Sequence, residues 1–426
     1  MSKTSKYILF TLLLLAVWEL PLFAAHRSGY DIHLTLSGAS IGKVALGLQT
    51  TNDVVIIDSL PKINKGSYLF TGKKSLAPGQ YTFIQNGRRL FNFLISFDQY
   101  TDLHFYTHVE NGRTTNVKVQ GDAENQAYLE FQRFIQDANR LPHLSQVDIN
   151  RIDHYTDSVA RRYPNTLLSI IAHNISKPPL PQYMALHDRR VLHTSILPIR
   201  LQNFFTNIVP PQPELVIPQI DSILNRCTDP LVKEWCGEFL LGYFFSSPIM
   251  GMENVAIHIA KKYTEGQIQS SHPELIAELS SYVSFNEHSL VGMAAPELNL
   301  PDLDGNKRSL RDVGTAYTIL LFYDEDCPIC REEIPLIEQL YQQYKSRRVQ
   351  VYAVYTQDRY QAWREYALTL NSEWVHVWDP DFSSGFHKLY GVTGTPKIYL
   401  LDRNKTIVGR GIDASVLQQI LSYQLD

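Results

Sequence analysis

Short apolar segments alternate with polar positions between about residues 30 and 120, and glycines separate them. A period of two with frequent turns is typical of strands that bury one face. The pattern predicts an antiparallel β-sandwich or small barrel over residues 26–122. The segments that show it are 32–36, 43–48, 54–57, 67–70, 81–84 and 90–95.

The period becomes that of helices between about residues 125 and 283, where apolar residues recur three and four positions apart. Prolines clustered between residues 178 and 218 divide this region into short helices and loops. Asp229 followed by Pro230 predicts an N-cap with proline at the first helical position. We therefore predict an irregular all-α domain over residues 123–288.

Strands and helices alternate from about Gly292 to the end of the chain. Alternation of this kind predicts an α/β sheet with helices on both faces, here over residues 289–426. The predicted strands are 319–323, 349–355, 397–401 and 406–409, and the predicted helices are 328–344, 360–370, 385–390 and 414–423.

The first 25 residues have the composition of a secretory signal peptide. Lys3 and Lys6 precede an apolar stretch from residue 7 to about 15, which is too short to span a membrane, and small residues end it at Ala25. We expect a chain that is soluble after cleavage and periplasmic or otherwise extracytoplasmic. Cleavage removes two lysines and Glu19, which changes the net charge from -4 to -5. This mild acidity, without a basic stripe, predicts that the protein does not bind nucleic acid.

Four cysteines in 426 residues are few for an exported protein that relies on disulfides for stability. Cys327 and Cys330 form a C-x-x-C motif where a predicted strand meets a predicted helix. A thiol at a helix start is favoured as a thiolate, the form that attacks disulfides, and a second thiol one turn later can displace the product. The same spacing also occurs in half of a zinc site, which would need two further ligands.

Cys227 and Cys236 lie nine positions apart, on either side of the helix start at Asp229. We interpret them as a structural disulfide or as two reduced core thiols. Their surroundings do not resemble a second activated redox pair, and their spacing does not complete a zinc site with Cys327 and Cys330.

Three separated motifs give residues 291–426 a family resemblance. This region resembles the thioredoxin-like exported reductases of the TlpA and ResA type. Residues 26–288 resemble, more loosely, two uncharacterised domains that precede such thioredoxin domains in Bacteroidetes proteins. The matching positions are Ala295-Pro296, Asp304-Gly305, Cys327-Pro328-Ile329-Cys330 with Glu333 and Pro335, and Gly394-Thr395-Pro396.

The resemblance implies a role for each matching position. Cys327 matches the attacking cysteine and Cys330 the resolving cysteine, while Glu333 matches an acid that adjusts cysteine protonation. Pro396 matches the cis-proline that faces the disulfide, and Thr395 offers backbone groups to an extended partner chain. We expect Pro328 and Ile329, between the two cysteines, to contact the same partner.

Two departures from the family pattern affect the expected chemistry. Asp326 replaces the usual tryptophan, and Leu321 replaces the buried aspartate of thioredoxins proper, which leaves Glu333 or water to exchange protons with Cys330. The acids at 324–326 oppose a thiolate on Cys327, whereas the helix dipole favours it. A less stabilised thiolate makes a less oxidising pair, so we predict a reductant of disulfides in exported proteins.

Other functions are consistent with parts of the sequence. A peroxiredoxin-like peroxidase would share Ala295-Pro296, but Leu320 and Asp324 stand where that chemistry uses proline and threonine. A non-enzymatic alternative is an envelope protein that binds a partner and uses the thioredoxin domain as a scaffold. No nicotinamide, flavin or metal motif is present, so we expect no cofactor. The resemblance implies a membrane thiol protein as electron donor.

Overall fold

The computed structural model describes residues 28–38, 42–61, 66–110, 113–141, 143 and 145–425. The predicted signal peptide, 1–25, lies outside these residues. The chain divides into two compact units, Met1–Leu201 and Gln202–Asp426. Within the described part of the chain, no helix is both long enough and apolar enough to cross a membrane.

Unit 1 contains two four-stranded sheets, with strand orders β4-β1-β7-β8 and β3-β2-β5-β6. Ile32, Phe70 and Phe105 of the first sheet and Leu46 and Phe83 of the second share one buried apolar cluster. The predicted sandwich is therefore present. Its strands are β1 (Tyr30–Ser37), β2 (Val44–Gln49), β3 (Val54–Leu60), β4 (Ser67–Gly72), β5 (Gly79–Gln85), β6 (Arg88–Ile95), β7 (Thr101–Glu110) and β8 (Arg113–Gln120).

One strand pair in the sandwich differs from the antiparallel prediction. β1 pairs with β7 in parallel, whereas its other neighbour, β4, is antiparallel. Parallel neighbours need a long crossover connection, and here five strands separate β1 from β7 along the chain. The alternation of apolar residues fixes which face of a strand is buried, but it does not specify the direction of the neighbouring strand.

Helices cover the end of the sandwich at β6. Asn125 of α2 accepts a hydrogen bond from Leu94 N–H at 2.7 Å and donates to Leu94 C=O at 2.8 Å, which fixes α2 against β6. The helices here are α2 (Ala123–Asn139), α3 (Gln146–Arg162), α4 (Leu167–Ser176) and the 3₁₀ turns η1 (Pro181–Tyr183) and η2 (Arg189–His193); α5 (Ile196–Asn207) contains the boundary between the units.

Unit 2 begins with helices and continues into the C-terminal α/β domain. Asp229 caps α7, its side chain accepting from the backbone N–H groups of Leu231 and Val232, and Pro230 is the first helical residue, as predicted. Four helices precede the α/β domain: α6 (Pro213–Arg226), α7 (Pro230–Phe245), α8 (Met252–Thr264) and α9 (Pro273–Asn286).

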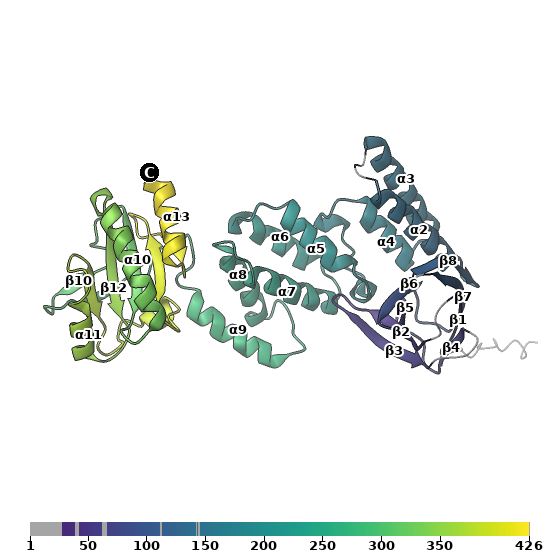
Figure 1. The fold of residues 1–426 in the computed structure, drawn as a ribbon, viewed down its shortest axis with the longest axis horizontal. Helices are drawn as coiled ribbons and strands as arrows, with labels where there is room; N and C mark the ends of the chain where they lie inside the picture. Colours follow the sequence, from purple (N-terminus) through teal and green to yellow (C-terminus); the bar gives the residue numbers. More distant parts are fainter. Residues whose placement is uncertain are drawn as a thin grey trace, which may run out of the picture. The chain divides into compact units, whose positions relative to one another are not determined.

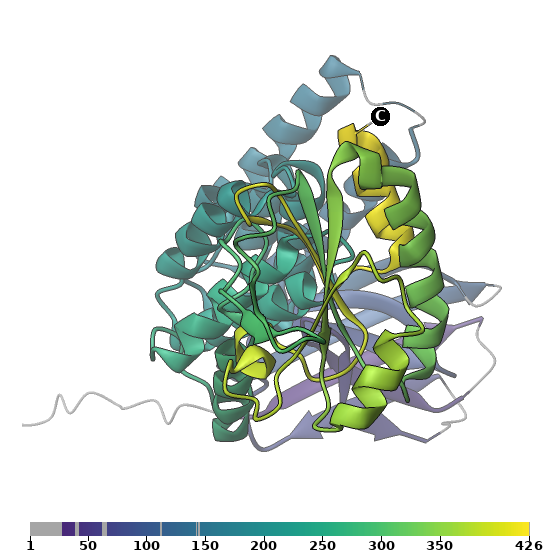
Figure 2. The same cartoon turned by 90° about the vertical axis from the view of Figure 1, so that its left-hand side faces the viewer.

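The α/β domain contains a five-stranded sheet of order β13-β12-β11-β14-β15, in which β13, β12 and β11 are parallel and β14 and β15 antiparallel. Figure 2 shows α10 and α13 on one side of this sheet and α12 on the other. A hairpin of β9 (Asn299–Pro301) and β10 (Lys307–Ser309) precedes the elements β11 (Tyr317–Tyr323), α10 (Pro328–Tyr344), η3 (Lys345–Arg347), β12 (Val349–Tyr355), α11 (Tyr360–Ala367), β13 (Val375–Trp378), α12 (Phe386–Leu389), β14 (Lys397–Leu401), β15 (Ile407–Arg410) and α13 (Ala414–Leu425).

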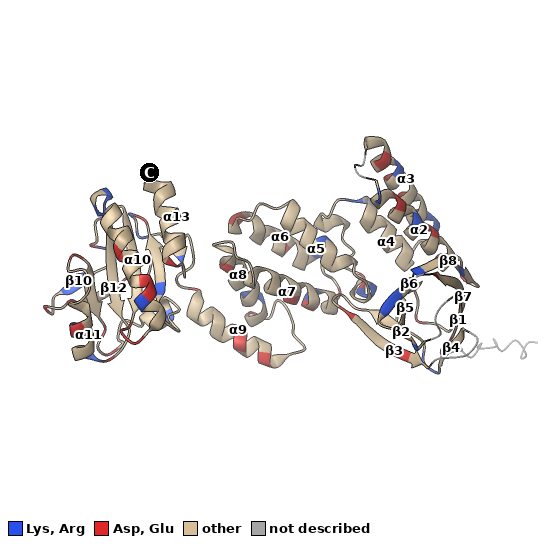
Figure 3. Cartoon of the chain, in the orientation of Figure 1, with Lys and Arg blue, Asp and Glu red and all other residues tan. Residues whose placement is uncertain are grey.

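The predicted fold class, a multidomain chain with an N-terminal β region, a helical middle and a C-terminal α/β thioredoxin fold, is confirmed (Figure 1). The boundary between the compact units lies at Leu201, inside the predicted helical domain, and the predicted domain limits stay a prediction. Basic and acidic residues are interspersed along the elements of each unit (Figure 3). The expectation that the protein does not bind nucleic acid also stays a prediction.

Candidate functional site

The strand β11 and the helix α10 place Cys327 at a helix start. All seven residues of β11 are buried or half-buried, and the chain then turns through 324–326 into α10. Cys327 is the N-cap of α10, and its Sγ accepts a hydrogen bond from the backbone N–H of Cys330 at 3.0 Å. Unpaired N–H groups at this end of a helix favour negative charge, so the position suits a nucleophilic thiolate.

The two thiols differ in their surroundings. Cys327 is 8% exposed and Cys330 is fully buried, and both are free thiols in the structure. Burial raises the pKa of Cys330 to about 12, and the neighbouring Cys327 sulfur adds to this effect. Cys327 is therefore the sulfur that a partner can reach, and Cys330 needs help to lose its proton.

A loop before β14 brings Thr395 and Pro396 to the dithiol. The Thr395–Pro396 peptide bond is cis, as the resemblance implied, and Cys327 Sγ donates to the Thr395 carbonyl oxygen at 3.2 Å. Pro328 and Ile329 are exposed beside the cysteines, with Ile329 57% accessible. The roles of these four residues in binding a partner stay predictions.

Asp324 is a site residue whose contact the sequence reasoning missed. Its carboxylate is 9% exposed and accepts a hydrogen bond from the Thr395 hydroxyl at 2.6 Å and from Asp326 N–H at 2.9 Å. The Thr395 hydroxyl and the Asp324 backbone also face the Cys330 sulfur, and both lower the pKa of Cys330 against the larger effect of burial. Thr395 thus connects the buried thiol to a buried carboxylate.

Arg359 changes the electrostatic balance expected from the acids at 324–326. Its guanidinium contacts the mostly buried Glu325 at 2.8 Å and the exposed Asp326 at 2.9 Å, next to Cys327 in the sequence. An adjacent cation offsets the repulsion that these two carboxylates exert on a thiolate. The sequence analysis treated the acids at 324–326 as unpaired, because Arg359 lies more than thirty positions away in the sequence.

Two other positions bear on proton exchange with Cys330: Glu333, which was expected to take part, and Leu321, which replaces an aspartate. The Glu333 carboxylate accepts from the backbone N–H of Ala414 at 2.7 Å, at the start of α13, and among the described residues it has no hydrogen bond to either sulfur. Its influence on cysteine protonation stays a prediction. Leu321 is buried in the same apolar cluster as both cysteines, so this position offers Cys330 no carboxylate.

Cys227 and Cys236 are brought together in the helical part of unit 2. Cys227 ends α6 and Cys236 lies within α7, and both are buried thiols. The pKa of Cys236 is raised well above its usual value, chiefly by a hydrogen bond with Cys227 and also by burial. Their proximity is compatible with both interpretations drawn from the sequence, and the structural disulfide stays a prediction.

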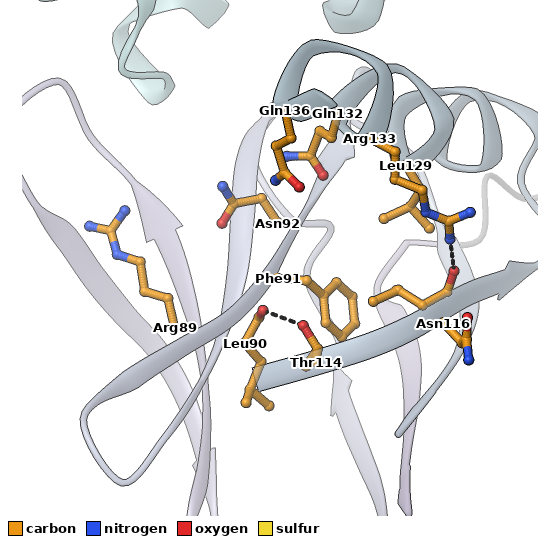
Figure 4. Close-up of a pocket in the computed structure, with 11 residues that line it drawn as sticks. Arg89, Leu90, Phe91, Asn92, Thr114, Asn116, Leu129, Gln132, Arg133 and Gln136 are labelled. Atoms are coloured by element: carbon orange, nitrogen blue, oxygen red, sulfur yellow. Dashed lines mark hydrogen bonds between the residues drawn. The ribbon is translucent and has the colours of Figure 1, made fainter. Parts of the chain in front are cut away.

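Unit 1 contains a separate pocket of about 340 Å³ between β6, β8 and α2 (Figure 4). Two of its polar side chains already bond to the backbone: Thr114 donates to Leu90 C=O at 2.8 Å and Arg133 to Val117 C=O at 2.7 Å. The pocket is lined by no cysteine.

The family match lies in the C-terminal region. Residues 291–410 match the AhpC/TSA family. Thiol-disulfide oxidoreductase ResA of Bacillus cereus is 27% identical over 143 residues, which are 34% of this chain and 76% of ResA. Thioredoxin-like protein YneN of Bacillus subtilis is 29% identical over 118 residues, 27% of this chain and 68% of YneN. A thioredoxin-like protein from Bacteroides caccae, known from a crystal structure, covers 66% of this chain and 97% of its own, with 17% identity and a TM-score of 0.46.

The sequence relatives confirm the predicted type of protein. These relatives are named thiol-disulfide oxidoreductase and thioredoxin-like protein, which agrees with the predicted redox enzyme. The C-terminal region of this chain therefore belongs to the AhpC/TSA thioredoxin-like family, and its homologues are thiol-disulfide oxidoreductases of the ResA/TlpA type.

Proposed function

We propose that this protein is an exported thiol-disulfide oxidoreductase that reduces disulfides in other extracytoplasmic proteins through Cys327 and Cys330. The observation that carries the proposal is the position of Cys327, which caps α10 with its sulfur beside Thr395 and Pro396. Export rests on the composition of residues 1–25 alone.

The proposed reaction transfers two electrons from the dithiol to the substrate. The Cys327 thiolate attacks one sulfur of a substrate disulfide, which forms a mixed disulfide and releases the first substrate thiolate, protonated from solvent. Cys330 then attacks the Cys327 sulfur, which releases the second substrate thiol and leaves the Cys327–Cys330 disulfide. A thiol protein, which we propose to be membrane-bound, must return the two electrons.

The second step requires that buried Cys330 lose its proton. We propose that the Cys330 proton passes to the Thr395 hydroxyl oxygen while the hydroxyl proton passes to Asp324. The Thr395 hydroxyl then donates to the new thiolate, and Asp324 is left protonated until it returns the proton to water. The 2.6 Å bond between Thr395 and Asp324 supports this path, which takes the place of the aspartate that Leu321 replaces.

Replacing Asp324 by asparagine is expected to slow the resolution of the mixed disulfide by about 10²-fold, because the step loses its general base. Thr395→Val should have a similar effect, since it breaks the path without adding charge. Quenched-flow measurement of the mixed disulfide reports this step, whereas the attack by Cys327 is expected to change little. In both variants the resolution rate should rise with pH up to the pKa of Cys330.

Two further variants serve as comparisons. Glu332→Gln removes an exposed acid from the same helix and should leave resolution unchanged. Glu333→Gln tests the residue that the family resemblance favours. Fast resolution in Asp324→Asn together with slow resolution in Glu333→Gln would assign the proton transfer to Glu333 instead.

The reducing direction is part of the proposal. Strong oxidants of the DsbA type owe their potential to a stabilised reduced form. Burial opposes a thiolate on Cys330, which supports a reducing pair. Because Arg359 contacts Glu325 and Asp326, these acids support a reducing pair less than the sequence alone suggested.

Cys330→Ser tests the proposed function directly. Without the resolving thiol, mixed disulfides between Cys327 and substrates should accumulate, and mass spectrometry of the captured proteins would identify them. The matched control is Cys327→Ser combined with Cys330→Ser, which should capture none. Equal capture by the control, or no dithiothreitol-reversible adduct with Cys330→Ser, would contradict the proposal.

A further inference from the structure

Three side chains that can bind metals meet on the outer face of the sheet β4-β1-β7-β8 in unit 1. His33 lies in β1, and Asp102 and His104 lie in β7. The parallel register pairs His33 with His104, and strand alternation places Asp102, two residues earlier, on the same face. Their neighbours Ile32 and Leu103 point inward and are buried, so the core fixes the face of the sheet from which the three side chains project.

The three side chains are close to one another. The His33 and His104 rings are stacked with centroids 4.1 Å apart and an angle of 5° between their planes. His104 Nε2 lies 3.2 Å from Asp102 Oδ1, and one nitrogen or oxygen atom from each residue lies within 4.8 Å of the others. The side chains of Asp102 and His104 are 56% and 37% exposed, so a hydrated cation can reach them.

We propose that His33, Asp102 and His104 bind a divalent transition metal of the zinc type. Imidazole nitrogen and carboxylate oxygen are zinc ligands, with bonds of about 2.0–2.2 Å, whereas calcium and magnesium prefer oxygen alone. Tetrahedral ligands stand roughly 3.3 Å apart at these bond lengths, so ligand atoms up to 4.8 Å apart need to close by up to about 1.5 Å. The two parallel rings must also rotate so that their in-plane nitrogen lone pairs meet at one point. Three protein ligands leave one coordination position for water.

The bound metal would join β1 to β7, the parallel pair whose connection is the longest in this sheet. A ligand that binds only the folded chain stabilises it in proportion to its affinity and concentration. The inference is independent of the dithiol chemistry, since its residues belong to unit 1 and both redox cysteines belong to unit 2.

Titration of the full chain with Zn²⁺ by calorimetry tests the site. The protein is first treated with chelator and oxidised, because reduced Cys327 and Cys330 also bind zinc. We expect zinc binding that weakens at least tenfold in His33→Asn and in His104→Asn. With Co²⁺ as a second probe, the visible spectrum should show nitrogen and oxygen ligands without thiolate charge-transfer bands.

His108→Asn is the matched control, because His108 lies on the same strand and is exposed, with its ring bonded to the Ser37 hydroxyl at 3.1 Å. This variant should bind zinc as the unmodified chain does. If a substitution of His33 or His104 prevents folding, Asp102→Asn, which changes an exposed side chain, decides the question by the same tenfold criterion. Unchanged zinc affinity in the folded variants would overturn the proposal.

Discussion

Replacing Cys327 by serine is expected to reduce the rate of insulin-disulfide reduction to that of dithiothreitol alone. Only a thiolate attacks a disulfide at a useful rate, and a serine hydroxyl at the start of α10 does not ionise near neutral pH. Cys330 cannot take over the attack because it is fully buried and its pKa is raised to about 12. The turbidity of precipitating insulin chains measures the rate.

Cys227→Ala is the control for the loss of a buried thiol elsewhere. Cys227 ends α6 in the helical part of unit 2, and its replacement should leave insulin reduction unchanged. Equal rates with the unmodified chain and with Cys327→Ser would mean that the dithiol is not catalytic. The scaffold interpretation, in which the thioredoxin domain only holds a partner, would then be favoured.

Local pattern was sufficient to predict the elements around the dithiol. The helix α10 begins and ends at the predicted residues, Pro328 and Tyr344, because proline at its start and a continuous apolar face mark both limits. The strands β12 and β14 also coincide with their predicted ranges. Strand β13 was not predicted, since four residues, Val-His-Val-Trp, are too few to establish a period.

Contacts between residues that are far apart along the chain could not be predicted from the sequence. Asp324, Glu325 and Asp326 are consecutive acids in the sequence, yet Asp324 bonds to Thr395 whereas Arg359 contacts the other two. Its partner Thr395 lies 71 positions away, and Arg359 is brought in only by the turn after β12. The one available signal was the position of Asp324 directly after a buried strand, which predicts a less exposed side chain.

The match of Glu333 to an acid in the family pattern also did not specify which group Glu333 contacts. The match by spacing predicted an acid near the cysteines, and in the structure this carboxylate bonds to the backbone at the start of α13. An acid at a helix N-terminus satisfies an unpaired N–H group and stabilises the helix. The residue can therefore be required for folding whether or not it exchanges protons with Cys330.

An ion pair between a buried arginine and a partly exposed glutamate connects the helices of unit 2 to the thioredoxin sheet. Arg410, at the end of β15, bonds to Glu253 of α8 and to the Asn286 side chain at the end of α9, the latter at 2.6 Å. The Arg410 side chain is 4% exposed, and Tyr282 donates to the other oxygen of Glu253 at 3.2 Å. Both helices thus meet the sheet through one guanidinium.

Replacing Arg410 by methionine is expected to lower the free energy of unfolding of unit 2 by about 2 kcal/mol, because it leaves Asn286 and the partly exposed Glu253 without their partner. Urea unfolding followed by circular dichroism measures the loss, and hydrogen exchange should show faster opening of α8 and α9. Arg308→Met is the control, since Arg308 is 51% exposed and lies 3.9 Å from Asp302, a pair worth less than about 1 kcal/mol. If both variants lose the same small amount, the Arg410–Glu253 pair does not hold the helices to the sheet, and apolar packing of α9 alone must do so.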